Sequence, residues 1–342
     1  MTNGNATLRE VADAAGVSVP IASRVLNQDP TVRVRDETRT RIHQTAEKLG
    51  YTPNHVARSL RGSRSGAIGL IMHGLDSPIN VSVLDGARGR CAGAGYVTLL
   101  AEAKELVTDH SQLRTFLARG RLDGAILHAG YGEGDRLIEQ ISKTIPAVLV
   151  NAEGGGAVPT VRLDDGAAGA MATQHLLDLG HQEISFIGGS KDSQSSIRRE
   201  TGYRKALEAG SGAGKIDIIH ANWSAEGGTA ATKTLLRRRT LPTALVVANA
   251  VTAAGVLSAL RDAKIAVPEE ISVVAIHDPW FVRHLSVALT TVRLPLFELG
   301  STAAAMLLES IAGNQPGDAF LDDPPPELIV RQSTRHPRVR QP

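Results

Sequence analysis

The sequence predicts an α/β protein in which a small helical unit precedes two doubly wound parallel sheets. Two observations support this class. Residues 7–27 contain two short amphipathic segments separated by Gly16, which is the spacing of a helix, a tight turn and a second helix. From Ala67 onward, short apolar runs alternate with helix-length amphipathic segments, a pattern typical of parallel sheets with helices on both faces.

The first two helices are expected to have definite ends. Thr7 and Glu10 have the spacing of a capping box, so the first helix should begin after Thr7. Gly16 can take the positive φ of a tight turn, and Ser18 is placed to cap the second helix. Pro20 falls in the first turn, where a missing N–H costs little. The residues that the second helix should turn outward are Ser23, Arg24 and Asn27.

A polar, arginine-bearing helix crossed by another small helix suits the major groove of double-stranded DNA. An ordinary helical hairpin has the same local pattern, so these residues alone leave both interpretations open. A third helix is expected over residues 36–49, followed by a flexible linker at Gly62–Gly66.

A longer set of motifs narrows the choice. They are Thr7-Leu8, Val11-Ala12, Ala15-Gly16-Val17-Ser18, Ser23-Arg24-Val25-Leu26-Asn27, Thr38-Arg39, Leu49-Gly50-Tyr51, Pro53-Asn54 and Ala57-Arg58-Ser59-Leu60. Together they resemble the opening of LacI/GalR-family transcription regulators, and the likeness runs through nearly the whole chain. The resemblance implies a sequence-specific DNA-binding repressor that binds a palindromic operator as a homodimer. A small-molecule effector in a cleft between two lobes would control that binding.

The resemblance also implies the domain organisation. A helix-turn-helix headpiece is expected over residues 1–52, and a hinge helix with its linker over residues 53–66. Residues 67–334 should form a two-lobed core of periplasmic-binding-protein type that binds the effector and dimerises. The expected lobes are residues 67–162 with 295–323, and residues 163–292 with 324–334.

By resemblance, Val19, Pro20 and Arg24 reach the edges of bases. Val19 and Pro20 offer only apolar surface, so directional recognition falls mainly to Arg24, whose guanidinium matches guanine O6 and N7. The alternative for Arg24 is a phosphate contact, which fixes register without selecting a sequence. The residues expected to hold phosphates are Thr7, Ser18, Ser23 and Asn27.

The hinge segment should contact DNA through Asn54, His55, Ala57, Arg58 and Leu60. The segment is too short to hold a helix alone, but two copies packed together over DNA would form stable helices. Leu60 would then be an apolar wedge in the minor groove, with Ala57 allowing close approach. A plain linker with an incidental leucine is the alternative.

Six positions match the effector-contacting pattern of the family: Asn80, Asn151, Arg199, Trp223, Asn249 and His277. Arg199 would grip hydroxyls or carboxylates, Trp223 would stack on a sugar face, and Asn249 would both donate and accept hydrogen bonds. Two alternatives stay open. Arg199 could pair with Asp164 or Asp165, and Trp223 could be a surface or dimer-contact residue.

Several of these positions depart from the family pattern in the same direction. Ala250, His277 and Asn151 stand where the family commonly has aspartate, and Ile79-Asn80 replaces a usual aromatic pair. With fewer counter-charges near Arg199, these departures favour an anionic ligand, such as a sugar derivative or other carboxylate.

Bulk properties limit the remaining classes. Residues 1–66 carry ten Lys and Arg against six Asp and Glu, whereas the remainder carries 27 against 29, as expected for a basic DNA-binding unit joined to a neutral core. Cys91 is the single cysteine, and no apolar run approaches the ~18 residues of a membrane span, so a cytoplasmic protein is expected. No nucleotide-binding, nucleophile-elbow or metal-ligand motif is present, so we expect no enzyme, cofactor or metal. The alternatives are a solute-binding protein with the same core and, less favoured, a sugar-modifying enzyme.

Overall fold

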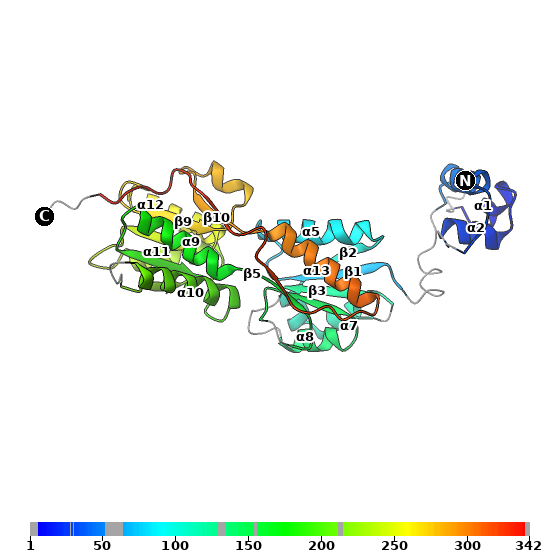
Figure 1. Ribbon diagram of the computed structural model, residues 1–342, viewed down its shortest axis with the longest axis horizontal. Coiled ribbons are helices and arrows are strands. Elements are labelled where there is room, and N and C mark those ends of the chain that lie inside the picture. The colour runs from blue at the N-terminus through cyan, green and yellow to red at the C-terminus, as the bar shows by residue number, and fades with distance from the viewer. Residues whose placement is uncertain are drawn as a thin grey trace. The chain divides into compact units, whose positions relative to one another are not determined.

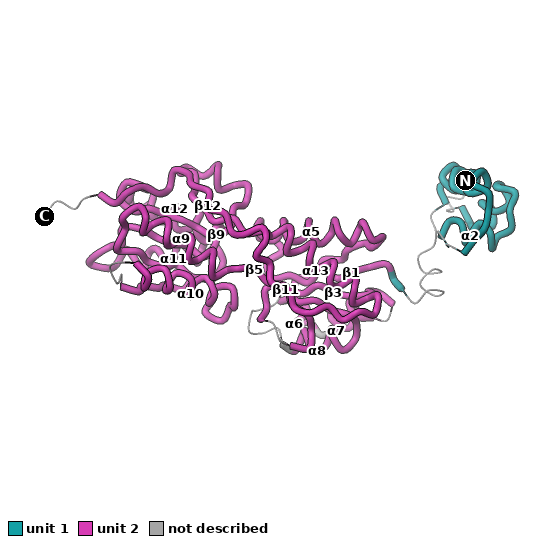
Figure 2. Tube along the Cα trace, in the orientation of Figure 1, with its two compact units in different colours: residues 1–65 teal, residues 66–342 magenta. Residues whose placement is uncertain are grey.

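The computed structural model describes residues 6–27, 29, 31–51, 64–118, 120–128, 135–153, 156–210 and 215–338. The chain divides into two compact units, Met1–Ser65 and Gly66–Pro342 (Figure 2). The described part of the first unit is helical, and the second unit contains two sheets with their covering helices (Figure 1).

The first unit contains three helices, α1 (Leu8–Ala14), α2 (Val19–Leu26) and α3 (Asp36–Lys48). The predicted capping box is confirmed, because the Glu10 amide donates to Thr7 Oγ1 at 3.3 Å and the Thr7 amide donates to Glu10 Oε2 at 2.6 Å. Gly16 has a φ of +65°, as the turn between α1 and α2 requires. A small core of Val11, Ala15, Val25 and Ile42 closes the three helices.

The expectation for Ser18 is only half right. Ser18 occupies the N-cap position of α2 with an extended backbone, but its side chain makes no capping hydrogen bond. A capping hydroxyl accepts from the second or third amide of a helix. Here the second position is Pro20, which has no N–H, so one of the two possible donors is missing.

The first sheet of the second unit has the strand order β11-β5-β4-β3-β1-β2, and all its pairs are parallel. Its strands are β1 (Ala67–Met72), β2 (Val97–Glu102), β3 (Gly124–His128), β4 (Ala147–Val150), β5 (Thr160–Leu163) and β11 (Ala319–Leu321). Helices α5 (Asn80–Gly93) and α13 (Leu296–Ile311) pack on the face that carries Ile68 and Leu70. The opposite face, with Ile71, is covered by α6 (Ala103–Thr108), α7 (His110–Phe116) and α8 (Asp135–Ser142) (Figure 1).

The second sheet has the order β12-β10-β9-β8-β6-β7, parallel except for the antiparallel pair of β12 and β10. Its strands are β6 (Ile184–Gly188), β7 (Ile218–His220), β8 (Ala244–Val247), β9 (Ser272–Ile276), β10 (Thr290–Arg293) and β12 (Glu327–Ile329). Its helices are α9 (Asp165–Asp178) and α10 (Gln194–Ala209) on one face, and α11 (Ala225–Leu235) and α12 (Ala250–Asp262) on the other, with the 3₁₀ helix η1 (Trp280–His284). The predicted fold class is confirmed.

The chain passes between the sheets three times. It leaves the first sheet after β5 and enters α9, returns between β10 and α13, and leaves again between β11 and β12. The apolar cores of the two sheets are continuous through one large cluster of buried residues. Because parallel strands point their carboxyl ends at one edge, this connectivity places the strand ends of both sheets around a shared space.

Candidate functional site

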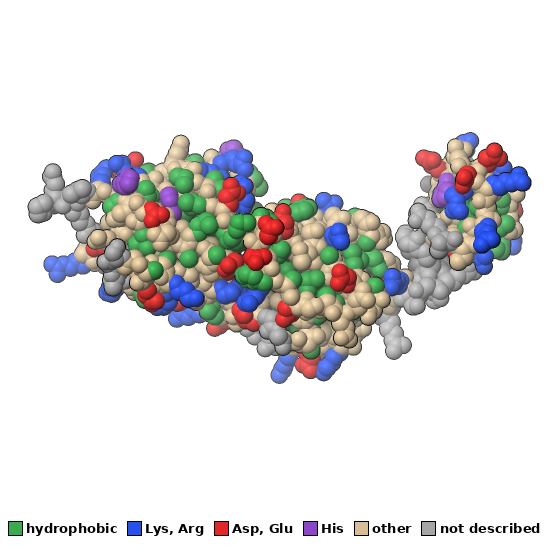
Figure 3. All heavy atoms as spheres, viewed as in Figure 1, with side chains coloured by type: hydrophobic (Ala, Val, Ile, Leu, Met, Phe, Trp, Pro, Cys, Tyr) green, Lys and Arg blue, Asp and Glu red, His purple; other side chains and the backbone are tan. Residues whose placement is uncertain are grey.

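The exposed face of α2 carries the residues expected to meet DNA. Pro20, Arg24 and Asn27 are exposed, while Val19 and Ser23 are half-buried. Asn27 Nδ2 donates to the Ser23 carbonyl oxygen at 2.8 Å, which fixes the end of this face. On the face of the unit seen in Figure 3, basic side chains lie beside acidic ones, consistent with its modest excess of positive charge.

Arg24 is the cation best placed on this face. Its side chain is 62% exposed, and among the described residues its nearest carboxylate oxygen is Asp29 Oδ2, 3.8 Å from Nε. Asp29 is itself held by Thr31, whose hydroxyl and amide donate to Oδ1 at 2.6 and 2.8 Å. So loose a contact leaves the guanidinium able to turn toward a base edge or a phosphate.

Thr7 differs from the other residues expected at phosphates. Its hydroxyl donates to Glu10 Oε2 at 3.0 Å and accepts from the Glu10 amide. An ionised phosphate only accepts hydrogen bonds, so the Thr7 hydroxyl could donate to a phosphate only by giving up its bond to Glu10 Oε2. Five further expected DNA contacts lie outside the described residues and stay predictions: Asn54, His55, Ala57, Arg58 and Leu60.

A cavity of about 600 Å³ opens where the strand ends of the two sheets face each other. All six residues expected to contact an effector line it: Asn80, Asn151, Arg199, Trp223, Asn249 and His277. Asn151 follows β4 and His277 follows β9, whereas Arg199 comes from α10. The sequence therefore identified residues that the fold brings together, although they lie almost 200 positions apart at the extremes.

Arg199 corrects the electrostatic expectation. Its side chain is 3% exposed, and the fully buried carboxylate of Asp165 accepts a hydrogen bond from Nε at 2.8 Å and lies 2.7 Å from Nη2 in an ion pair. Nη1 donates to the Ala248 carbonyl at 2.6 Å, and Nη2 also donates to His277 Nε2 at 2.8 Å. All three guanidinium nitrogens are thus engaged within the protein. Arg199 therefore has a buried counter-charge, and it offers no fork of two uncommitted nitrogens to a carboxylate ligand.

Asp165 is a residue that the sequence analysis raised only as an alternative partner. Its second oxygen accepts from Arg198 Nη2 at 2.8 Å, and Arg198 Nη1 donates to Glu153 Oε1 at 2.7 Å. Arg198 belongs to the second sheet's helices, while Glu153 follows β4 of the first sheet. One buried carboxylate therefore joins the cavity arginine to an ion pair that spans the two lobes.

The remaining expected residues serve the protein as well as the cavity. Asn249 caps α12 by accepting from the Thr252 amide at 2.6 Å, and it donates to the Trp223 carbonyl at 3.2 Å. Asn80 donates to the carbonyls of His73 and Gly74, both at 2.8 Å, which shapes the loop after β1. The side-chain amides of Asn249 and Asn80 therefore have only their remaining donor and acceptor positions available for a ligand.

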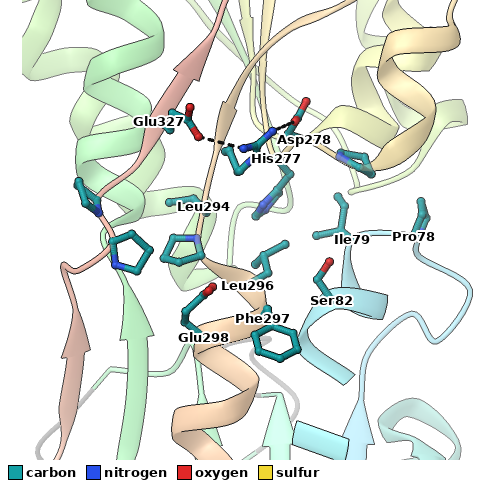
Figure 4. A pocket seen from close by; sticks show the side chains of 15 residues that line it. Pro78, Ile79, Ser82, His277, Asp278, Leu294, Leu296, Phe297, Glu298 and Glu327 are labelled. Carbon is teal, nitrogen blue, oxygen red and sulfur yellow. Dashed lines mark hydrogen bonds and ion pairs between the residues drawn. The ribbon is translucent and has the colours of Figure 1, made fainter. Parts of the chain in front are cut away.

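A second cavity of about 400 Å³ adjoins the first and shares His277 with it. Figure 4 shows the His277 ring directed toward Leu296 and Ile79, with Asp278 directed the opposite way. Asp278 is 1% exposed and binds Arg293 and Arg331 at 2.8 and 2.7 Å. Burial opposes its ionisation, but the hydrogen bonds outweigh burial and lower its pKa. Asp278 thus belongs to an ion cluster with Arg293 and Arg331. It does not take the place of the aspartate that the family commonly has where this chain has His277.

His128, at the end of β3, also lines the first cavity. Burial, with the neighbouring His73 charge, lowers its pKa to about 4. Between that value and the pKa of about 6.5 in an unfolded chain, only the unfolded state is protonated, so stability falls as the pH falls. Because His128 is partly exposed, we expect a loss of about 1–2 kcal/mol between neutral pH and about pH 5.

This loss can be measured by urea unfolding at both pH values. The variant His128→Gln should show a shallower pH dependence than the parent chain, whatever its absolute stability. The same slope in both proteins would mean that His128 is not the titrating group.

Two further findings concern the described residues as a whole. No helix among them has the length and apolar character needed to cross a bilayer. No group of three or more of their His, Cys, Asp or Glu side chains is placed so that it could hold a metal ion.

Comparison with known proteins gives matches on both units. Residues 7–54 match the bacterial regulatory proteins of the lacI family, and residues 173–334 match a periplasmic binding protein-like domain. The HTH-type transcriptional repressor PurR of Haemophilus influenzae (strain PittEE) is 31% identical over 344 residues, covering 96% of this chain and 99% of the relative.

Solved structures agree with these matches. A LacI family transcriptional regulator from Mycobacterium smegmatis is 35% identical with a TM-score of 0.73, over 79% of this chain and 100% of that one. The lac repressor dimer bound to operator and the anti-inducer ONPF is 26% identical with a TM-score of 0.80, over 97% of this chain and 100% of that one. The similarity therefore includes the helical unit as well as the two-lobed unit.

Proposed function

Since this chain belongs to the lacI family of bacterial regulatory proteins and is a DNA-binding transcriptional repressor, we propose that it binds a palindromic operator as a homodimer. A small molecule in the cavity of about 600 Å³ would control that binding. A solute-binding protein with the same core, the alternative raised by the sequence, leaves the helix-turn-helix unit without a role.

The observation that carries the proposal is the exposed face of α2. The Arg24 guanidinium lies on α2, is largely exposed and has only the loose contact with Asp29. The first turn of the same helix carries Pro20, which is not bulky, so the helix can approach a groove closely. An arginine fork can bind guanine O6 and N7 in the major groove. The similar lac repressor structure contains a dimer, an operator and a small molecule, which supports the same arrangement for this chain.

The proposed dimer has a physical basis in the second unit. The edge strand β2 exposes Val97, Leu99 and Leu100, with Val97 61% exposed, and Val81 on α5 is also exposed. An apolar edge strand left in water invites pairing with another chain. A twofold dimer would bury this edge and present two helical units to two symmetric half-sites.

The cavity supplies the proposed control. An effector shifts a repressor between states only if it binds those states with different affinity. Arg198 and Glu153 join the lobes through the same Asp165 that holds the cavity's Arg199. A ligand bound beside Arg199 would thus stabilise one geometry of this ion-pair link between the lobes, which gives it different affinities for the two states.

The variant Arg24→Ala tests the recognition step. We expect it to weaken binding to the cognate operator by about 1–3 kcal/mol and to relax the preference at one base position, because the lost contact is specific to one base. Selection of binding sites from a random duplex library, followed by fluorescence anisotropy on the selected site, measures both quantities.

Lys48→Ala, at the exposed end of α3, is the matched control, since it removes the same charge away from α2. It should weaken binding to all DNA sequences alike or leave binding unchanged. An equal loss on all sequences for Arg24→Ala would reassign Arg24 to the phosphate backbone.

A further inference from the structure

Three residues around the first cavity have buried polar atoms with no hydrogen-bond partner among the described residues. They are Asn151 (Oδ1), Trp223 (Nε1) and His277 (Nδ1). A buried polar atom without a partner costs roughly 1–3 kcal/mol, so three in one place require an explanation. Asn151 and His277 also have left-handed backbones, with φ of 63° and 71°. Such strain in residues other than glycine is concentrated at ligand sites.

The bonding roles of these atoms follow from their neighbours. Arg199 can only donate hydrogen bonds, and its Nη2 lies 2.8 Å from His277 Nε2, so Nε2 must accept and cannot carry a proton. A neutral imidazole then carries its proton on Nδ1. His277 is buried beside the Arg199 charge, and these two causes lower its pKa well below the ordinary value. His277 Nδ1 and Trp223 Nε1 are therefore both N–H donors for which the described residues supply no acceptor.

The charges around the cavity are balanced. Arg199 is neutralised by Asp165, and the two other charged residues of the lining, Lys104 and Asp76, are exposed and opposite in sign. The groups left to select a ligand are therefore neutral donors and acceptors. An ionised ligand would have to leave water with only the exposed Lys104 or Asp76, whose charges water screens, as its counter-charge.

We propose that His277 determines the specificity of the effector site. Arg199 fixes His277 as the Nδ1–H tautomer, and His277 and Trp223 then both donate to acceptor oxygen or nitrogen atoms of an uncharged ligand. A hydroxyl or N–H group of the same ligand donates to Asn151 Oδ1. This inference rests on the proposed effector role of the cavity. An aspartate at position 277 would accept hydrogen bonds instead, so His277 reverses the direction of the bond that the ligand makes.

The first test needs no ligand. Long-range ¹H–¹⁵N spectra of the full chain with labelled histidine distinguish the two neutral tautomers and the imidazolium. The variant His277→Asn identifies the signal, and asparagine tolerates the left-handed backbone at this position. We expect a neutral Nδ1–H tautomer at neutral pH and still at about pH 6.5, where an ordinary histidine is half protonated. An Nε2–H tautomer, or an imidazolium at neutral pH, would overturn the proposal.

The second test compares uncharged probes with anionic derivatives of the same compounds. Trp280→Phe removes an exposed tryptophan that is 69% exposed and leaves Trp223 as the only fluorophore of its kind, at the cavity wall. Titrations would use ribose against ribose 5-phosphate, glucose against gluconate and glucose 6-phosphate, and adenosine against adenosine monophosphate. We expect each binding pair to favour the uncharged member by about tenfold or more. Tighter binding of the anionic members would overturn the proposal.

Two variants separate a specific role for His277 from general damage. His277→Asp should weaken the uncharged probe by about tenfold, because an acceptor replaces the donor. His284→Asn, on the exposed η1, should leave probe binding unchanged. Equal affinity of His277→Asp and the parent would contradict the proposal. Operator binding is measured separately on the parent chain, so a failure of the repressor proposal would leave these outcomes readable.

Discussion

Replacing Asp165 by asparagine is expected to lower the free energy of unfolding of the Gly66–Pro342 unit by about 3–5 kcal/mol. Asp165 is fully buried and pairs with two arginines, Arg199 through one oxygen and Arg198 through the other. Asparagine has almost the same shape but no charge, so Arg199 would remain buried without its counter-ion and Arg198 would keep only the exposed Glu153. Breaking a buried pair from one side costs far more than the pair itself contributes.

Urea unfolding followed by tryptophan fluorescence measures this loss, because both tryptophans, Trp223 and Trp280, belong to the Gly66–Pro342 unit. Asp262→Asn is the matched control, since Asp262 is exposed and pairs only with Arg261 beside it among the described residues. Its effect should stay within about 0.5 kcal/mol. A loss equally small for Asp165→Asn would show that Asp165 does not carry the charge balance of the cavity.

The same variant has a consequence for ligand preference. With Asp165 neutral, Arg199 keeps its charge and regains N–H groups for an outside acceptor. Asp165→Asn should therefore bind anionic probes more tightly than the parent does, in the fluorescence titrations described above. An unchanged preference would mean that Asp165 is not what excludes anions.

Replacing Gly202 by alanine is expected to destabilise the same unit by about 2–4 kcal/mol. Helices α9 and α10 touch through their backbones here, because a Cβ on Gly202 would lie 2.0 Å from the Gly166 carbonyl oxygen. Gly169 makes the reciprocal contact, with a Cβ position 2.2 Å from the Arg199 carbonyl oxygen. The better helix propensity of alanine, about 1 kcal/mol, offsets only part of the cost of separating the helices.

Gly89→Ala gives a control of opposite sign. Gly89 lies inside α5, and a Cβ there would meet nothing within 4 Å. This variant should raise the free energy of unfolding by about 0.5–1 kcal/mol. Since the contact of α9 with α10 also brings Arg199 to Asp165, Gly202→Ala should weaken probe binding as well. A Gly202→Ala chain as stable as the parent would contradict the close contact of these helices.

The sequence predicted the larger elements of the fold because they have their own periodicity. The buried strands β1, β3 and β4 are continuous apolar runs, and long amphipathic segments mark α9 and α12. No continuous apolar run marks β5, β10 and β12, because Thr, Arg or Glu interrupts their three or four residues. So short a segment shows no period, and its conformation depends on pairing with a strand far along the chain, as β11 pairs with β5.

For the candidate effector site, the residues that line the cavity could be named from the sequence, but the contacts that set their charge and protonation could not. The family pattern named six residues that line one cavity. The partner of Arg199 lies 34 positions away in the chain and becomes its neighbour only through the contact of α9 with α10. The tautomer of His277 likewise depends on Arg199, 78 positions away. Spacing along a sequence carries no information about such distances.

The most direct test of the repressor account is the DNA preference of the purified full-length chain. Palindromic duplexes selected from a random library would be compared with scrambled duplexes of the same composition, by fluorescence anisotropy over a range of salt concentrations. The account predicts a palindrome bound about 10³-fold or more tightly than scrambled duplex, with affinity falling steeply as salt rises. Equal affinity for palindromic and scrambled duplexes at every salt concentration would contradict it.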